Sequence, residues 1–117
     1  HTYYQRALTI FEELGDRAGM ATTYHALGVL AQDRGDYDTA HNLYQRALTI
    51  KEALGDRAGT ATTYHNLGAL AHDQSHYDTA RTHYQRALTI FEELGDRVNI
   101  ATVRRNLDIL AQDQNDT

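Results

Sequence analysis

Apolar side chains recur along this chain at spacings of three and four residues, and the whole pattern repeats every 40 residues. The seven residues Tyr-Gln-Arg-Ala-Leu-Thr-Ile occur at positions 4–10, 44–50 and 84–90. Spacings of three and four place apolar residues on one face of an α-helix. A fixed period of this size is typical of repeat architectures, in which each unit buries its apolar face against its neighbours. The pattern therefore predicts an all-α fold built from antiparallel helix pairs.

Six helices are predicted, and the sequence Gly-Asp-Arg, which occurs three times, ends one helix and begins the next. Gly15, Gly55 and Gly95 suit the left-handed residue that follows a helix, and the aspartates after them suit an N-cap. The polar residues from Asp113 to Thr117 are predicted to form a disordered tail. The predicted helices cover residues 1–14, 17–33 and 37–54, the two matching stretches of residues 55–94, and residues 97–112.

Two helix types alternate along the chain. The seven-residue sequence lies in the second helix of each pair, here called B, and the helix before it is called A, so the order is B-A-B-A-B-A. Residues 55–94 match residues 15–54 at 28 of 40 positions, which indicates a recent duplication. Because the chain opens with His1, partway into a B helix, we expect it to be a piece of a longer protein. The predicted organisation is one repeat domain, 1–117, made of a half repeat (1–14), two repeats (15–54 and 55–94), a half repeat or cap (95–113) and a polar tail (114–117).

Two local features lead to structural predictions. Gly28 lies in mid-helix, where glycine costs about 1 kcal/mol relative to alanine, so we expect a neighbouring helix to approach it closely. In the second repeat, Ser75-His76 replaces Gly35-Asp36. Serine is a weaker helix stop and histidine a weaker N-cap, so we expect this turn to fray more easily.

Composition excludes several classes of protein and partner. The chain has no cysteine, so disulfides, thiolate metal sites and cysteine nucleophiles are excluded. The net charge of −5 argues against a nucleic acid partner. No apolar run approaches the length of a membrane span and no signal peptide is visible, so no membrane partner is expected and a cytoplasmic location is favoured.

The seven histidines do not form a metal-binding pattern. His65 and His72 are two turns apart and His76 lies in the following turn, so no pair spaced by four lies within one predicted helix. Ser75 is the only serine and no glycine-rich phosphate loop is present, so neither catalysis, a metal nor a cofactor is predicted. We interpret His25 and His65 as groove or inter-helix hydrogen-bonding residues, and we hypothesise a response to pH between about 5 and 7 through them.

The residue pattern of each pair of A and B helices resembles that of a known family. The A helix carries an aromatic residue, Leu-Gly three residues later, and then an alanine. The B helix that follows carries an alanine, an aromatic residue and a second alanine. This pattern is similar to the tetratricopeptide repeat. The resemblance implies an α-solenoid with a right-handed superhelix, in which small residues let the A and B helices approach. The matching residues are Tyr24, Leu27, Gly28, Ala31, Ala40, Tyr44 and Ala47 in the first repeat and Tyr64, Leu67, Gly68, Ala71, Ala80, Tyr84 and Ala87 in the second.

This chain departs from the common form of that family. Its 40-residue period is longer than the usual 34 residues, and the family's proline near the end of the B helix is absent. The longer form is similar to the repeats of kinesin light chains, of spindle-orientation adaptors built on Leu-Gly-Asn repeats, and of arrays in bacterial signalling proteins. In the last A helix, Arg104 replaces the aromatic residue and Asp108 replaces glycine, which is typical of a polar end cap.

The resemblance also implies a binding surface. In this family the A helices line a concave groove that holds an extended or helical peptide, so a protein or peptide partner is expected. The chaperone-binding members hold a terminal carboxylate with lysine and asparagine residues, but His25, Val29 and Thr102 stand at those sites and only Asn66 matches, so we do not expect that role. The groove positions are Thr22, His25, Val29, Gln32, Asp33, Thr62, His65, Asn66, Ala69, His72, Asp73, Thr102, Arg105, Asn106, Ile109 and Gln112.

Two other functions stay open at this point. The first is self-association, end to end or by helix exchange, because the first B helix has no A helix before it and the last A helix has no B helix after it. Arg104 and Asp108 argue against this pairing, because they spoil the surface that a second helix would need. The second is a sensor arm in a larger bacterial nucleotide-dependent regulator. The candidate self-association residues are Tyr4, Leu8, Phe11, Leu107 and Leu110.

Overall fold

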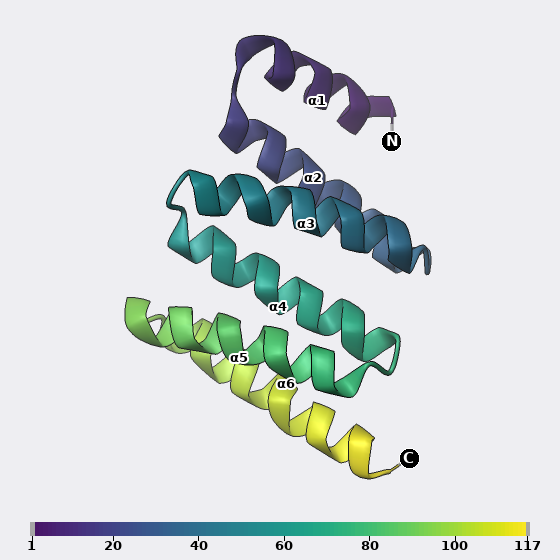
Figure 1. Ribbon diagram of the computed structural model, residues 1–117, viewed down its shortest axis with the longest axis vertical. Coiled ribbons are helices and arrows are strands. Elements are labelled where there is room, and N and C mark those ends of the chain that lie inside the picture. The colour runs from purple at the N-terminus through teal and green to yellow at the C-terminus, as the bar shows by residue number, and fades with distance from the viewer. Residues whose placement is uncertain (1, 117) are drawn as a thin grey trace. The chain divides into compact units, whose positions relative to one another are not determined.

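The computed structural model describes residues 2–116, and within this range the chain folds into six α-helices (Figure 1). The described residues contain no strand, so the predicted all-α fold class is confirmed. The chain divides into two compact units, residues 1–56 with the first three helices and residues 57–117 with the last three. Within each unit, consecutive helices run antiparallel (Figure 1). The helices are α1 (Thr2–Leu14), α2 (Arg17–Asp33), α3 (Tyr37–Ala53), α4 (Arg57–Asp73), α5 (Tyr77–Leu94) and α6 (Arg97–Asn115).

The predicted boundaries of the first five helices are correct to within one residue. The last helix is the exception, because α6 continues to Asn115, and the predicted disordered tail is therefore wrong as far as that residue. The ends of the prediction at His1 and Thr117 lie outside the described residues. The description of the chain as one domain and the right-handed superhelix both stay predictions.

Contacts with neighbouring helices explain why α6 continues beyond the last apolar residue. The Nε2 atom of His72 in α4 lies 2.6 Å from Oδ2 of Asp113. The guanidinium of Arg81 in α5 donates a hydrogen bond to the side-chain oxygen of Gln114. Polar tertiary contacts thus stabilise this last turn, and the spacing of apolar residues in the sequence does not predict such contacts.

All five turns between the helices use the same backbone hydrogen bonds. A residue in the left-handed conformation donates its N–H to the carbonyl three residues earlier, and the next residue donates to the carbonyl five residues earlier. This pairing satisfies carbonyls that the helix end leaves without partners. In four turns the left-handed residue is a glycine with φ between 68° and 78°. The carboxylates of Asp16, Asp36 and Asp96 then accept N-cap hydrogen bonds, so the predicted stop-and-restart signals are confirmed there.

Each complete pair of helices is built around a tyrosine ring lying on a glycine. A Cβ atom placed on Gly28 of α2 would lie 2.7 Å from Cε1 of Tyr44 in α3. In the second unit, a Cβ on Gly68 of α4 would lie 2.7 Å from Cδ1 of Tyr84 in α5. Real Cβ atoms do not approach a ring this closely, so only glycine admits it. The close helix approach predicted from Gly28 is confirmed.

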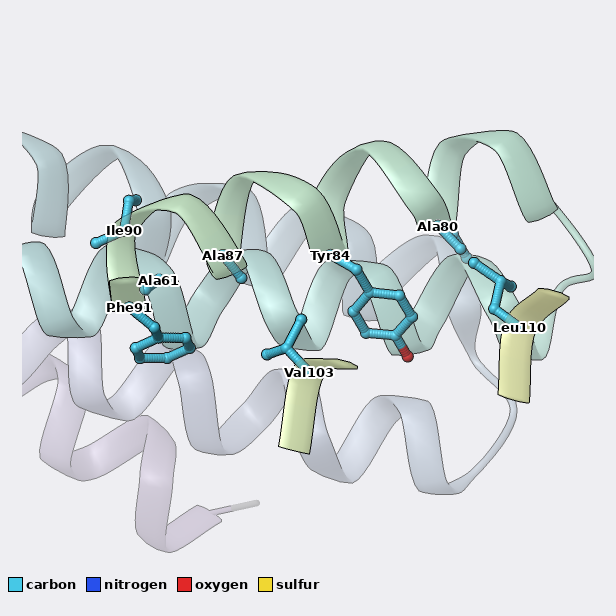
Figure 2. Packing of buried hydrophobic residues seen from close by; sticks show 9 residues of the cluster. Ala61, Ala80, Tyr84, Ala87, Ile90, Phe91, Val103 and Leu110 are labelled. Atoms are coloured by element: carbon cyan, nitrogen blue, oxygen red, sulfur yellow. The ribbon is translucent and has the colours of Figure 1, made fainter. Parts of the chain in front are cut away.

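The core of the second unit surrounds the tyrosine of α5 (Figure 2). Figure 2 shows Phe91 and Tyr84 extending from α5 on either side of Val103 from α6. Leu110, two turns further along α6, belongs to the same buried cluster. Helix α5 therefore packs both on the A-type helix before it and on the one after it. The remaining buried members of the cluster are Ala61, Ala71, Ala80, Ala87 and Ile90.

The first unit has a related arrangement, in which α1 packs on α2. A Cβ placed on Gly19, in the first turn of α2, would lie 2.6 Å from the Phe11 ring of α1. This contact was not predicted from the sequence. In contrast with the other helices, α1 has no fully buried residue among those described.

The turn between α4 and α5 lacks the glycine and the aspartate of the other turns. Ser75 adopts φ of 61°, a conformation that costs a residue with a Cβ about 1–2 kcal/mol. His76 makes no side-chain cap hydrogen bond, so the predicted weaker cap is confirmed. The backbone bonds of this turn are nevertheless formed, from Ser75 N to His72 O at 2.9 Å and from His76 N to Ala71 O at 2.8 Å. The expected fraying stays a prediction.

Replacing Ser75 by glycine and His76 by aspartate should stabilise the chain. We expect the free energy of unfolding to rise by about 1–2 kcal/mol, because the left-handed strain is relieved and an N-cap hydrogen bond is gained. Urea denaturation followed by circular dichroism measures the change. The reverse exchange in the first unit, Gly35→Ser with Asp36→His, is the matched control and should destabilise by a similar amount. Equal stability of all three chains would contradict this account.

Replacing Gly68 by alanine should destabilise the second unit, although alanine is the better helix former by about 1 kcal/mol. We expect a loss of about 1–3 kcal/mol, because the new methyl group overlaps the buried Tyr84 ring. Urea denaturation measures it, and Ala101→Gly on the exposed side of α6 calibrates helix propensity alone. A gain in stability for Gly68→Ala would show that the ring moves aside freely and would refute the packing argument.

Candidate partner-binding surface

Two polar contacts join the A-type helices α4 and α6 in the second unit. The Nδ2 atom of Asn106 lies 2.7 Å from Nε2 of His65. Two turns further along both helices, Nε2 of His72 and Oδ2 of Asp113 form the second contact, at 2.6 Å. The two histidines are two turns apart on α4, and their partners have the same spacing on α6. Three predicted groove residues, His65, His72 and Asn106, are therefore partly or wholly engaged within the chain.

Two further predicted groove residues hold the helices of the first unit together. The hydroxyl of Tyr44 donates a hydrogen bond of 2.8 Å to the side-chain oxygen of Gln32. The ring of His25 lies against the same tyrosine, with ring centroids 5.9 Å apart. In the second unit, His65 and Tyr84 repeat this contact at 5.6 Å. The interpretation of the repeated histidines as inter-helix residues is supported by these contacts.

Burial shifts the proton equilibria of these groups. It lowers the pKa of His65 below the usual 6.5, because the charged imidazolium loses solvation. Burial also lowers the pKa of His25, and the positive charge of Lys51 lowers it further. Burial and the carboxylate of Asp73 raise the pKa of Tyr84 to about 12. His25 and His65 are accordingly predominantly neutral at pH 7 and add little positive charge to the surface.

The threonines at the predicted groove positions use their hydroxyl hydrogens internally. Thr22, Thr62 and Thr102 each donate to the carbonyl four residues earlier in the same helix, at distances of 3.0–3.2 Å. A partner can therefore reach the acceptor lone pairs of these hydroxyls but not their protons. The threonines offer a partner weak and uniform hydrogen-bonding capacity.

One position is apolar in all three A-type helices. It carries Val29 in α2, Ala69 in α4 and Ile109 in α6. Val29 is 37% exposed and Ile109 is 41% exposed, whereas most large apolar side chains of these helices are covered. In the second unit, Ala69 lies between His65 and His72 along α4, and Ile109 lies between their two partners along α6.

Charged side chains flank this apolar position. Asp33 and Asp73, one turn after Val29 and Ala69, are exposed. Arg105, one turn before Ile109, is also exposed. The second unit therefore presents an apolar centre between one basic and one acidic residue. Asn66, another predicted groove residue, is half-buried on α4.

The structure corrects part of the self-association prediction. Leu110 is 1% exposed and belongs to the core of the second unit, so it is not available to a second copy. Leu107 packs, partly buried, against the same cluster. Tyr4, Leu8 and Phe11 are half-buried on α1, and contact through them stays a prediction.

Within residues 2–116, no group of three or more histidine and carboxylate side chains is arranged to hold a metal ion. In the same part of the chain, no helix combines the length and the apolar character that crossing a membrane requires.

The fold and the repeated tyrosine–glycine contact agree with a comparison of sequences. A family model described as tetratricopeptide repeat matches residues 2–53 and 54–117. The chain belongs to the tetratricopeptide repeat family. Tetratricopeptide repeats generally mediate protein–protein interaction, and their fold is typically a scaffold without enzymatic activity. A comparison with curated proteins finds no match.

Solved structures include chains with a similar fold. The crystal structure of BtubC (BKLC) from P. vanneervenii matches with a TM-score of 0.69 and 20% sequence identity. The match covers 97% of this chain and 56% of that chain, so this sequence spans little more than half of the solved protein's length. At this identity the likeness shows a shared fold, and the predicted helical-repeat class is confirmed by it.

Asp113 is a structural residue of this surface that was not predicted from the sequence. The signal was present as an offset of 41 residues, which joins His65 to Asn106 and His72 to Asp113. An offset one residue longer than the period brings an A-type helix into contact with the next A-type helix. Charge and polarity alone had placed Asp113 in a solvated tail.

We expect the stability of the chain to fall as the pH drops below about 6.5. The folded chain holds His25 and His65 with pKa values lowered by burial, so the unfolded chain binds more protons in this range. Stability therefore rises with pH through the window and is fully present above pH 7. Urea denaturation at several pH values between 5.5 and 7.5 measures the slope.

The variant His65→Asn should flatten this pH dependence, because asparagine does not titrate and retains an amide opposite Asn106. His41→Asn, which removes a histidine exposed on α3, controls for the loss of one titrating group. An unchanged slope in His65→Asn would contradict the assignment of the pH response to the buried imidazole.

Proposed function

We propose that this chain is a protein-interaction module that binds an extended or helical peptide segment on the exposed faces of its A-type helices, without chemistry of its own. The observation that carries the proposal is one repeated apolar position, at which Val29 and Ile109 are exposed and Ala69 is half-buried. At this position Val29 and Ile109 remain partly exposed on an otherwise polar helix face. They are suited to receive an apolar anchor of a partner.

The contacts between α4 and α6 support this use of the surface. The pairs His65–Asn106 and His72–Asp113 hold the two helices on either side of Ala69 and Ile109. A surface fixed before binding loses less conformational freedom when a partner arrives, which favours affinity. The polar pairs therefore serve the apolar centre by fixing it.

Charge gives this surface a direction. Arg105 precedes Ile109 on α6, and Asp73 follows Ala69 on α4. A peptide with an apolar anchor, an acidic residue on one side and a basic residue on the other complements this arrangement. The half-buried histidines, predominantly neutral at pH 7, compete little with Arg105 for the acidic residue.

A peptide display screen against the whole chain tests the proposal. We expect enriched peptides to carry an apolar anchor, and Ile109→Lys to weaken their binding by about tenfold or more. Amide shifts in NMR spectra should place the bound peptide on α4 and α6. Leu94→Lys, at a leucine of α5 that is 46% exposed where Ile109 is 41% exposed, is the matched control and should leave the affinity unchanged.

A different pattern of shifts would overturn this assignment. Peptides that perturb α3 and α5 instead, and bind Ile109→Lys as well as the parent chain, would show that the B-type helices form the binding surface. The roles as a self-association module or a sensor arm of a larger regulator, and the cytoplasmic location, stay predictions.

A further inference from the structure

Two histidines of α4 flank the apolar centre of the second unit, and each contacts α6. The Nε2 atom of His65 lies 2.7 Å from Nδ2 of Asn106. The Nε2 atom of His72 lies 2.6 Å from Oδ2 of Asp113. Histidine is the side chain whose ordinary charge change falls between pH 5 and 8. The charge beside the apolar centre therefore depends on pH.

The groups packed around His65 leave burial as the main influence on its protonation. Its ring lies beside Tyr84 of α5, with ring centroids 5.6 Å apart, and α6 contributes the uncharged amide of Asn106. The pKa of Tyr84 is raised to about 12, so this hydroxyl is also uncharged. Arg105, next to Asn106, is exposed to solvent. Burial lowers the pKa of His65, and the imidazole therefore gains its proton in the acidic part of the range.

His72 lies between an aromatic ring and a carboxylate. Tyr77 of α5 meets its ring edge-on, with ring centroids 6.1 Å apart, and Asp113 of α6 faces its Nε2 atom. Asp73, the next residue on α4, is exposed. The His72 side chain is itself 21% exposed, so its imidazole can exchange protons with solvent.

Both contacts can persist when the imidazoles gain a proton. A charged His72 donates from Nε2 to Asp113, as does the neutral tautomer that carries its proton on Nε2. At His65, a half-turn of the Asn106 amide replaces its nitrogen by its oxygen, which accepts a hydrogen bond from a protonated Nε2. Protonation therefore changes the charge of the surface while α4 and α6 stay joined.

The pair of imidazoles is particular to α4. At the position of His72, the other two A-type helices carry Gln32 and Gln112, which do not titrate. At the position of His65, α6 carries Arg105, whose charge is permanent. A fixed positive charge on α6 thus stands next to a conditional one on α4.

The formal charge around the apolar centre changes sign when both imidazoles are protonated. Of the groove residues of α4 and α6, Arg105 and Asp73 are charged at pH 7, and Asp113 adjoins them through His72. These three side chains carry one positive and two negative charges. Two protonated imidazoles leave three positive charges against two negative ones. Because charge complementarity selects partners, such a reversal changes which peptides fit.

We propose that protonation of His65 and His72 switches the charge preference of this surface. Near pH 7.5 the surface favours peptides with a basic residue beside the apolar anchor, and near pH 5.5 it favours peptides with an acidic residue there. This switch rests on the proposed peptide-binding function and adds regulation by pH to the same site.

Two display screens of the whole chain test the switch, one at pH 7.5 and one at pH 5.5. Both use the same random peptide library without histidine, in which aspartate and glutamate stay largely ionised at either pH. We expect both pools to carry apolar anchors, and the pool from pH 5.5 to be the more acidic. Circular dichroism at both pH values checks that the chain is folded.

One labelled peptide from each pool then gives a ratio of dissociation constants by fluorescence anisotropy. We expect this ratio to move by about threefold or more toward the acidic peptide between pH 7.5 and pH 5.5. A general loss of affinity at low pH affects both peptides and cancels in the ratio.

The double variant His65→Asn with His72→Gln should keep the ratio constant across this range. Both replacements retain an amide in place of the imidazole, and glutamine is the residue that the first repeat carries at the position of His72. His41→Asn, at an exposed histidine of α3, is the matched control and should shift as the parent chain does. Circular dichroism of each variant separates a lost switch from a lost fold.

The outcomes distinguish this switch from the binding function beneath it. Pools of equal charge, or a constant ratio in the parent chain, would overturn the switch and leave peptide binding in place. A shift that survives in the folded double variant would overturn the assignment to His65 and His72. No enriched peptide at either pH would overturn the proposed function as well.

Discussion

The packing of a tyrosine ring against a glycine, which has no side chain, determines how the helices of this chain pair. In both complete pairs, the ring of the B-type helix lies where the Cβ of any other residue would stand, at Gly28 and at Gly68. The glycine weakens its own helix by about 1 kcal/mol, and the buried ring more than offsets this through the apolar area it removes from water. The neighbouring alanines of α3 and α5 are fully buried, because their small side chains also let the paired helices approach closely.

The helices and turns were predictable because their causes are local. The left-handed glycines and the aspartate N-caps act through residues within one turn, so a sequence displays them directly. The end of α6 was not predictable in this way. It depends on Asp113 and Gln114 meeting His72 and Arg81, which lie more than 30 residues away. Leu110 was assigned to a free surface because its cover comes from α5, through packing that the order of helices alone does not specify.

The candidate surface was predictable only by position. The sequence identifies which residues lie on the outer stripe of each A-type helix, but a polar residue on that stripe has two equally plausible roles. It can face a partner or bond to the next helix, and His65 does the second while Arg105 remains exposed. Three-dimensional contact separates these roles. Apolar residues are less ambiguous, because Val29 and Ile109 are only partly covered in their own units and so stand out once exposure is known.

The uniform turns have a consequence for how such a chain can change in length. Because every turn closes with the same two backbone hydrogen bonds, a 40-residue segment can be duplicated or deleted between any two equivalent points without creating a new junction. Even Ser75 and His76, which lack the preferred side chains, keep those bonds. Recombination between equivalent turns of the coding sequence therefore keeps these backbone bonds available at each junction.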